Sequence, residues 1–191
     1  TGELMTSATI TDRLVALSRA LIGRIRGGLA QVNVLVSMFF AGMNGSVVAD
    51  TATVGALVLP AMKKAGYPAA FSAAVTGVSS TIGGIIPPSI MMIVLANATE
   101  ISIASLFAAG IVPGILIGVV IMVINHYFAV KYNFERSDEP FSVRRAGKEL
   151  YRSSFALLIP LVLVGSVMGG VASVVEAGAI TALVALFTGV F

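Results

Sequence analysis

Residues 41–51 read AGMNGSVVADT, a short polar stretch inside a long apolar one. Between Arg26 and Lys63 the only charged residue is Asp50. Spanning the roughly 30 Å hydrocarbon core of a bilayer takes about 20 apolar residues, and the 36 residues of this region exceed that length. Basic residues near membrane segments favour the cytoplasmic side, and they occur at both ends of the region. The chain is therefore expected to turn round between them.

The polar cluster at about 44–51 is the predicted turn. It leaves an outgoing limb at 27–43 and a return limb at about 52–62. At 1.5 Å per residue, the eleven residues of the return limb reach only about 16 Å, half of the core. The sequence therefore predicts a re-entrant helical hairpin over 27–66 with its tip inside the membrane. Irregular backbone is tolerated there only if it is buried in protein or lines a watery cavity.

A second interruption follows at 79–89, which reads SSTIGGIIPPS. Two adjacent glycines and two adjacent prolines fit poorly inside one straight helix, because Gly costs about 1 kcal/mol and Pro about 3 kcal/mol in a helix interior. The run 67–99 is therefore predicted to be a transmembrane helix that is broken near mid-membrane. A hairpin tip beside a broken helix is typical of the binding sites of secondary transporters.

The composition supports a membrane protein. Of 191 residues, 57% are hydrophobic and 11% are charged, with no Cys and a mean hydropathy of +0.99. A globular domain carries about 25% charged residues, so a soluble enzyme or a nucleic-acid-binding module is a poor interpretation, and a disulfide scaffold needs Cys. The fold class expected is all-α, a polytopic membrane protein.

All twelve Lys and Arg fall in three groups, at 1–26, at 63–64 and at 131–152. We expect these groups to lie on the cytoplasmic face. The predicted order is then a basic amphipathic arm helix at 1–26, the hairpin, the broken helix, a transmembrane helix at 101–131, a cytoplasmic linker with an amphipathic helix at 132–152, and two transmembrane helices at 153–191. Because the chain begins without Met and ends in an apolar run, we expect a piece of a larger protein.

Neutral oxygen groups crowd both interruptions: Asn44, Ser46 and Thr51 in the hairpin, and Ser79, Ser80 and Thr81 before the Gly-Gly pair. Such oxygens suit a hard monovalent cation better than a transition metal. Sodium is the natural candidate, and a proton relay is less well supported because no chain of ionisable groups is present. For any single hydroxyl, the simpler interpretation is a bond across helices or back to its own helix.

Asp50 is the one acid deep in an apolar region. An ionisable residue inside a membrane is a functional candidate by default, and the competing interpretation is an N-cap that satisfies the first amides of the return limb. Either role places it beside the site. His126, the only histidine, lacks metal-binding partners nearby and is interpreted as structural.

Four stretches carry a family resemblance: AGMNGSVVAD at 41–50, PAMKKAGY at 60–67, AAVT at 73–76 and SSTIGGIIPPSI at 79–90. In this order they resemble the large membrane subunit of TRAP transporters, the DctM-like permeases. The resemblance extends over nearly the whole chain.

The resemblance implies a sodium-coupled, elevator-type importer of carboxylate-bearing solutes such as C4-dicarboxylates or sialic acid. It also implies two partners, a small TRAP membrane subunit and a periplasmic substrate-binding protein, and a location in the bacterial inner membrane. The chain would then hold the first inverted repeat and the start of the second.

In that family a sodium site forms between the hairpin tip and the broken helix. From polarity and position, we expect sodium ligands among Gly45, Ser46, Asp50, Ser79, Ser80, Thr81 and Gly83. We expect the substrate to contact Asn44, Ser46, Thr51, Pro87 and Ser89.

Other interpretations remain open at this point. A hairpin-containing permease for divalent anions or arsenite shares the architecture but works without a binding protein. A purely structural membrane subunit would show no ion-dependent stability. An intramembrane enzyme is disfavoured, because Asp50 has no second acid at membrane depth.

Overall fold

The computed structural model describes residues 8–22, 25–134 and 143–190. Over these residues the chain forms helices and no strands. The helices, in chain order, are α2 (Ala8–Ile22), α3 (Gly28–Asn44), α4 (Val47–Lys64), α5 (Ala69–Ser80), the short 3₁₀ helix η1 (Thr81–Gly84), α6 (Ile90–Thr99), α7 (Ile103–Lys131), α8 (Val143–Met168) and α9 (Val174–Val190). Parts of the predicted arm (1–7 and 23–24), part of the predicted linker (135–142) and residue 191 lie outside the described residues.

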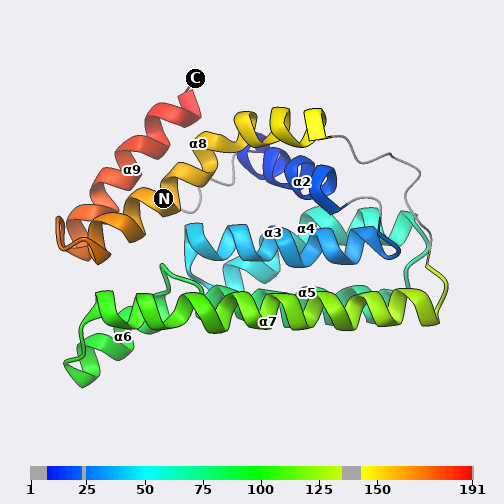
Figure 1. Ribbon diagram of the computed structural model, residues 1–191, viewed down its shortest axis with the longest axis horizontal. Coiled ribbons are helices and arrows are strands. Elements are labelled where there is room, and N and C mark those ends of the chain that lie inside the picture. Colours follow the sequence, from blue (N-terminus) through cyan, green and yellow to red (C-terminus); the bar gives the residue numbers. More distant parts are fainter. Residues whose placement is uncertain (1–7, 23–24, 135–142, 191) are drawn as a thin grey trace.

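The helices lie in three layers (Figure 1). The layer of α2, α8 and α9 covers one side of the pair α3 and α4, and α5 with α7 covers the other, with α6 at one end of that layer. α3 packs against α2, α4, α5 and α7, and eleven of its 17 residues are buried. A helix that is apolar all round requires such surroundings. α3 is therefore the centre of the fold.

α3 and α4 form the predicted helical hairpin, but its turn is shorter than predicted. Only Gly45 and Ser46 lie between the two helices. The prediction of a tip over 44–51 and an eleven-residue return limb is wrong, because α4 has 18 residues, about 27 Å of helix. The reason is local: Ser46 caps α4, so the polar residues that follow it form the first turns of a helix.

α5 and α6 lie on either side of the predicted interruption. α5 ends at Ser80, η1 follows it, and α6 begins only at Ile90. The Gly-Gly and Pro-Pro pairs both fall in this gap. Ser89 then caps α6, where its Oγ accepts a hydrogen bond from the Met92 amide at 3.4 Å. The break therefore lies where glycine and proline predict it.

α7 packs closely against the hairpin and against the break, the interruption at 81–89 between α5 and α6. Three of its glycines share one face: a side chain at Gly110 would meet the Ile85 carbonyl oxygen, one at Gly114 the Ile86 side chain, and one at Gly118 the Met38 sulfur. Residues four apart lie on the same side of a helix, and small residues there let helices approach closely. The glycine face of α7 thus fixes the distance between α7 and the break.

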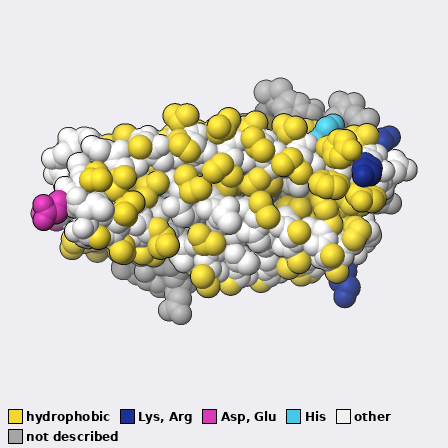
Figure 2. Space-filling view, turned by 90° about the horizontal axis from the view of Figure 1, so that it is seen from below, with side chains coloured by type: hydrophobic (Ala, Val, Ile, Leu, Met, Phe, Trp, Pro, Cys, Tyr) yellow, Lys and Arg dark blue, Asp and Glu magenta, His cyan; other side chains and the backbone are white. Residues whose placement is uncertain are grey.

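The opposite face of α7 is apolar and exposed, with Val112 72%, Leu116 62% and Val123 64% exposed. Figure 2 shows hydrophobic side chains over most of this side of the molecule, basic ones towards one end and acidic ones at the other. Among the described residues, α7 is the one helix long and apolar enough to cross a membrane unbent, and α8 passes the same test only as two pieces bent by 56°.

Aromatic and basic side chains meet at one end of the molecule. The Lys131 amino nitrogen lies 5.8 Å from the centre of the Tyr132 ring, and the Tyr67 and Phe134 rings are 4.7 Å apart. Aromatic belts of this kind mark membrane–water interfaces.

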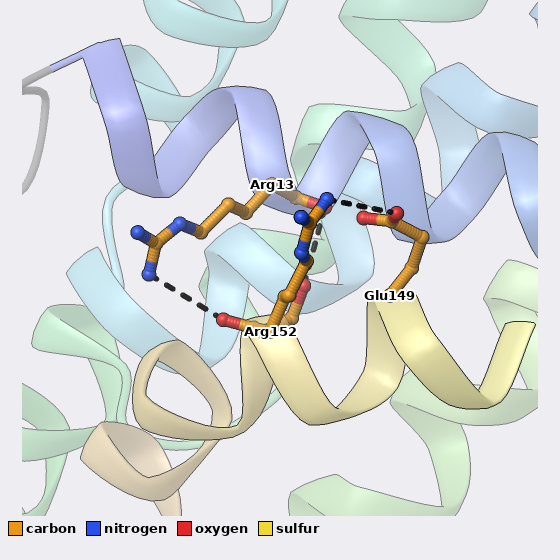
Figure 3. Close-up of polar contacts among 4 residues, drawn as sticks. Arg13, Glu149 and Arg152 are labelled. Carbon is orange, nitrogen blue, oxygen red and sulfur yellow. Dashed lines mark hydrogen bonds and ion pairs between the residues drawn. The ribbon is translucent and has the colours of Figure 1, made fainter. Parts of the chain in front are cut away.

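α2 is attached to α8 by polar contacts (Figure 3). Arg13 Nη1 donates to the Arg152 carbonyl oxygen at 3.4 Å, and Ser153 Oγ donates to the Arg13 carbonyl oxygen at 3.2 Å. Arg152 also pairs with Glu149 at 3.6 Å. α2 is therefore joined to the amino-terminal half of α8.

α9 begins with a reciprocal cap. The carboxylate of Glu176 accepts from the Ser173 amide at 2.8 Å, and Ser173 Oγ accepts from the Glu176 amide at 3.3 Å. This capping box satisfies two amides that a helix start leaves free. Glu176 lies in the first turn of α9.

Candidate cation and substrate site

The tip of the hairpin is closed by its own polar groups. Asn44 Oδ1 accepts from the Ser46 amide at 3.0 Å, and Ser46 Oγ accepts from the Ala49 amide at 3.4 Å. Gly45 has a φ of 60°, in the left-handed region that favours glycine. These contacts allow α3 to reverse into α4 within two residues.

The tip rests directly on the break of the other helix. The Ile90 amide, at the start of α6, donates to the Gly45 carbonyl oxygen at 3.1 Å. A side chain at Gly45 would overlap the Pro88 carbonyl oxygen, and one at Gly83 would lie 3.7 Å from the Ser46 backbone. The two interruptions that the sequence predicted separately are thus one structural unit.

A buried polar cluster lies behind the tip, between α3 and α5. Asn33 Nδ2 donates to Thr76 Oγ1 at 2.7 Å, Ser79 Oγ lies 3.1 Å from Asn33 Oδ1, and the Ser37 and Ser79 hydroxyl oxygens are 3.2 Å apart. All four side chains are at most 2% exposed. Buried polar groups are normally hydrogen-bonded, and this cluster satisfies that rule.

Asp50 departs from the rule. It lies in the first turn of α4 and is 0% exposed, and neither of its carboxylate oxygens has a hydrogen-bond partner. The N-cap interpretation is wrong, because Ser46 occupies that position. The hydroxyls of Ser37 and Ser80 interact with the carboxylate without reaching hydrogen-bond geometry. Burying an ion without a partner costs several kcal/mol or more, so this carboxyl group is either protonated or paired with a cation.

On the other side of the break, hydroxyl groups bond to backbone carbonyls. Ser80 Oγ donates to the Thr76 carbonyl oxygen at 2.8 Å, and Ser89 Oγ donates to that of Gly84 at 2.8 Å. Ser89 is buried beside Pro87 at the start of α6. The break therefore presents oxygen lone pairs and the amino end of a helix to the tip.

The structure brings six of the seven expected sodium ligands close together and separates one. Gly45, Ser46 and Gly83 meet at the tip, while Asp50, Ser79 and Ser80 lie one turn further back. Thr81 is exposed and bonds to the Val78 carbonyl of its own helix turn.

The expected substrate contacts divide in the same way. Asn44, Ser46, Pro87 and Ser89 lie at the meeting point of tip and break. Thr51 is exposed and donates to the Val47 carbonyl, so it does not face the break in the described structure.

Asn33, Ser37 and Thr76 belong to the cluster but were not predicted as site residues. A signal was present: Asn33 and Ser37 are four residues apart in an apolar helix, and Ser72, Thr76 and Ser80 repeat at the same spacing. Such spacing aligns polar groups on one helix face. The relation between the two faces depends on tertiary packing and is not visible in the sequence.

The donor set is chemically suited to a hard cation. It consists of one carboxylate, several hydroxyls, an amide oxygen and backbone carbonyls. Within the described part of the chain, no cluster of three or more His, Cys, Asp or Glu could hold a metal ion. Transition metals prefer such softer or more charged ligand sets, whereas neutral oxygens and carboxylates suit hard cations.

Comparison with known proteins supports a transport role for this arrangement. The profile of the family described as "Tripartite ATP-independent periplasmic transporter, DctM component" matches residues 1–191. The chain belongs to this family. The DctM component is a membrane transport protein and not an enzyme.

Three relatives illustrate the range of the DctM family. The sialic acid TRAP transporter large permease protein SiaM of Vibrio cholerae is 35% identical over 99% of this chain. The C4-dicarboxylate TRAP transporter large permease protein DctM of Pseudomonas aeruginosa is 36% identical over 100%, and the 2,3-diketo-L-gulonate TRAP transporter large permease protein YiaN of Escherichia coli is 36% identical over 97%. The chain spans 44% of the length of each of these three relatives.

Proposed function

We propose that this chain forms the first inverted repeat of a sodium-coupled TRAP importer for solutes that carry a carboxylate. The observation that carries the proposal is the contact of the hairpin tip with the helix break, beside a buried carboxylate that lacks a partner. Paired interruptions of this kind expose helix ends and backbone oxygens that can bind an anion and a cation together.

The arrangement of α7 supports a re-entrant hairpin. α7 has 29 residues, about 43 Å of helix, which is enough to cross a bilayer. The break against which the tip rests lies beside Gly110 and Gly114, so α7 continues about 10 Å beyond it to Ile103. If α7 spans the membrane, the tip ends inside it.

The charge distribution supports a cytoplasmic location for the open end of the hairpin, where α3 begins. Arg26 and Lys131 lie at the end where α3 begins and α7 ends, and Arg26 Nη1 donates to Asn133 Oδ1 at 3.3 Å. We assign this end to the cytoplasm, because basic residues beside membrane segments are retained there. The protein is then placed in the bacterial inner membrane.

The proposed cargo follows from the chemistry of the site and from the relatives. Sialic acid, C4-dicarboxylates and 2,3-diketo-L-gulonate, named for three relatives, all carry a carboxylate. The amino end of α6, which Ser89 caps, favours an anion. A small membrane subunit and a periplasmic binding protein complete the proposed system.

We propose that the tip, the break and α7 move together as one rigid unit, as in an elevator-type transporter. The Ile90–Gly45 hydrogen bond and the glycine face of α7 join them closely. Sodium bound between tip and break would supply the positive charge that the buried carboxylate lacks.

The proposal predicts uptake that depends on a sodium gradient and on the hydroxyls at the site. The transporter that contains this chain is reconstituted in liposomes with its small subunit and binding protein, and uptake of labelled sialic acid or a C4-dicarboxylate is measured. Ser46→Ala combined with Ser80→Ala is expected to lower the sodium-driven rate by about tenfold or more, since loss of even the outer-shell partners of metal ligands typically costs about 10–100-fold in metal affinity or activity.

The matched control is Thr99→Ala combined with Ser105→Ala, which removes two exposed hydroxyls, one at the end of α6 and one near the start of α7. The control is expected to transport like the wild type. Uptake that does not depend on the sodium gradient would refute the sodium coupling. Uptake without any binding protein would favour a permease of another class.

A further inference from the structure

The two limbs of the hairpin start and finish beside the last turns of α7. α3 begins at Gly28, α4 ends at Lys64 and α7 ends at Lys131, and Figure 1 shows these three helix ends at one end of the molecule, opposite the tip. We call this end of α3 and α4 the base of the hairpin. The 18 residues of α4 separate the base from the tip, about 27 Å of helix.

α4 ends in a Schellman motif, in which a left-handed residue folds the chain back over the last helical turn. The left-handed residue is Gly66, with a φ of 78°. Its amide donates to the Lys63 carbonyl oxygen at 3.2 Å, and the Tyr67 amide donates to the Met62 carbonyl oxygen at 3.1 Å. The motif fixes the position of Tyr67, whose side chain is 6% exposed.

α7 ends in the same motif. Asn133 takes the left-handed position with a φ of 52°, which asparagine adopts more readily than most residues. Its amide donates to the Val130 carbonyl oxygen at 3.3 Å, and the Phe134 amide donates to the Ala129 carbonyl oxygen at 3.0 Å. Phe134 therefore has the same place in this motif that Tyr67 has at the end of α4.

The two capped helix ends meet through aromatic rings. The ring centres of Tyr67 and Phe134 are 4.7 Å apart. Phe71, in the first turn of α5, has its ring centre 5.1 Å from that of Phe134 and 6.3 Å from that of Tyr67. Aromatic pairs at separations of about 4.5–7 Å attract one another beyond the effect of burial alone. We call Tyr67, Phe71 and Phe134 the aromatic clasp.

The end of α7 also holds the start of α3. Arg26 Nη1 donates to Asn133 Oδ1 at 3.3 Å. A side chain at Gly27 would overlap the Ala129 side chain, so the chain that enters α3 lies directly against the last turn of α7. Both limbs of the hairpin are therefore attached to α7 at the base.

The base determines where the tip lies, because the limbs are rigid helices. Tilting α4 by about 5° about its base would move the tip by about 2 Å. The tip is joined to the break by the hydrogen bond from the Ile90 amide to the Gly45 carbonyl oxygen at 3.1 Å, and such a bond is lost when its atoms move apart by about 1 Å more. A loose base would therefore release the tip.

We propose that the aromatic clasp holds the base of the hairpin against α7 and stays closed throughout transport. Tyr67, Phe71 and Phe134 are positioning residues, since they lie a full helix length from the tip and act on it through α4. That the clasp stays closed during transport rests on the proposed transport function, whereas its role in holding the base does not.

Hydrogen exchange tests whether the rings hold the base. The purified transporter that contains this chain is placed in lipid nanodiscs, and amide exchange is followed over residues 62–71. Phe134→Leu keeps an apolar side chain but removes the ring. Exchange over 62–71 is expected to become about two- to tenfold faster, which is the change in an equilibrium that one aromatic pair produces. A purely local role of Phe134 would alter exchange at the end of α7 alone.

The matched control for this measurement is Tyr151→Leu. It removes a ring that is 82% exposed on α8. Its exchange over 62–71 is expected to equal that of the wild type. Exchange over 62–71 that Phe134→Leu leaves at the wild-type rate would refute the clasp.

A covalent link tests whether the clasp stays closed during transport. The chain has no cysteine, so Tyr67→Cys combined with Phe134→Cys introduces one pair of thiols once any cysteine elsewhere in the transporter is replaced. With both thiols free, we expect faster exchange over 62–71 and a loss of uptake in proteoliposomes. Joining the thiols with a short bifunctional reagent is expected to restore both. The single variants, treated with the same reagent, are expected to stay impaired.

The cross-linked protein also shows how the proposal could fail. If it transports less than its form with free thiols, the base must open during transport, and the proposal is wrong. If the double variant folds poorly, Phe134→Leu still decides through hydrogen exchange whether the rings hold the base. A wild type that takes up no solute would refute the proposed transport function, and the exchange result would still decide the role of the clasp.

Discussion

Replacing Gly45 by alanine is expected to abolish uptake and to lower the stability of the protein by about 2–5 kcal/mol, of which roughly 1–2 kcal/mol comes from the left-handed backbone and the rest from overpacking. Gly45 has a φ of 60°, and its added Cβ would overlap the Pro88 carbonyl oxygen. Since that oxygen belongs to the backbone of the break, it cannot rotate away. The tip would have to lift off the break, which separates the two halves of the proposed site.

The measurement compares Gly45→Ala with Gly66→Ala in thermal unfolding and in uptake by proteoliposomes. Gly66 has a φ of 78° but no atom within 4 Å of an added Cβ. It therefore reports the cost of the backbone conformation alone, about 1–2 kcal/mol. If the two variants lose the same amount of stability and uptake, the contact between the tip and the break contributes to neither, and the site would have to be placed elsewhere.

Replacing Gly110 by alanine is expected to be the second most damaging change, with a loss of about tenfold or more in uptake, equivalent to about 1.4 kcal/mol or more. The added Cβ would overlap the Ile85 carbonyl oxygen and the end of Met92. Either α7 would have to move away from the break, or Ile85 would have to shift relative to the tip.

Two other glycines provide a graded series for this prediction. At Gly118 the added Cβ meets the Met38 sulfur at 2.6 Å, and a long, unbranched Met side chain can adjust, so a mild effect is expected. At Gly77 it meets nothing within 4 Å, and alanine there is expected to raise stability by up to about 1 kcal/mol because it is the better helix former. Equal losses at all three positions, measured by uptake and thermal unfolding, would contradict a specific role for Gly110.

Local signals were predicted well because they depend on neighbouring residues. The break was placed correctly, since two glycines and two prolines prevent a continuous helix wherever they occur. The boundaries of the hairpin tip were predicted poorly. The stretch after Ser46 is polar enough to suggest a turn. In the structure Ser46 caps α4, and Asp50 therefore lies in the first turn of that helix.

The candidate site was predicted only in outline. Polarity identified Asp50 and Ser80 correctly as members of a polar group, and it also included Thr51 and Thr81, which bond to their own helices. Asn33 was overlooked, because its spacing from Ser37 indicates a polar helix face but not what that face contacts. Its partner Thr76 is 43 positions away in the sequence.

The sequence by itself determined that the chain is a helical membrane protein, where its helices are interrupted, and to which family it belongs. Each of these follows from composition, local backbone preference or motif order. The tertiary structure alone decided that the Gly45 carbonyl meets the Ile90 amide, that Asp50 is buried without a partner, and that Ser37 and Ser80 lie beside it. The physical reason is that side chains from α3, α4 and α5 come together only when the helices pack, and the charge balance of a buried site is a property of that packing.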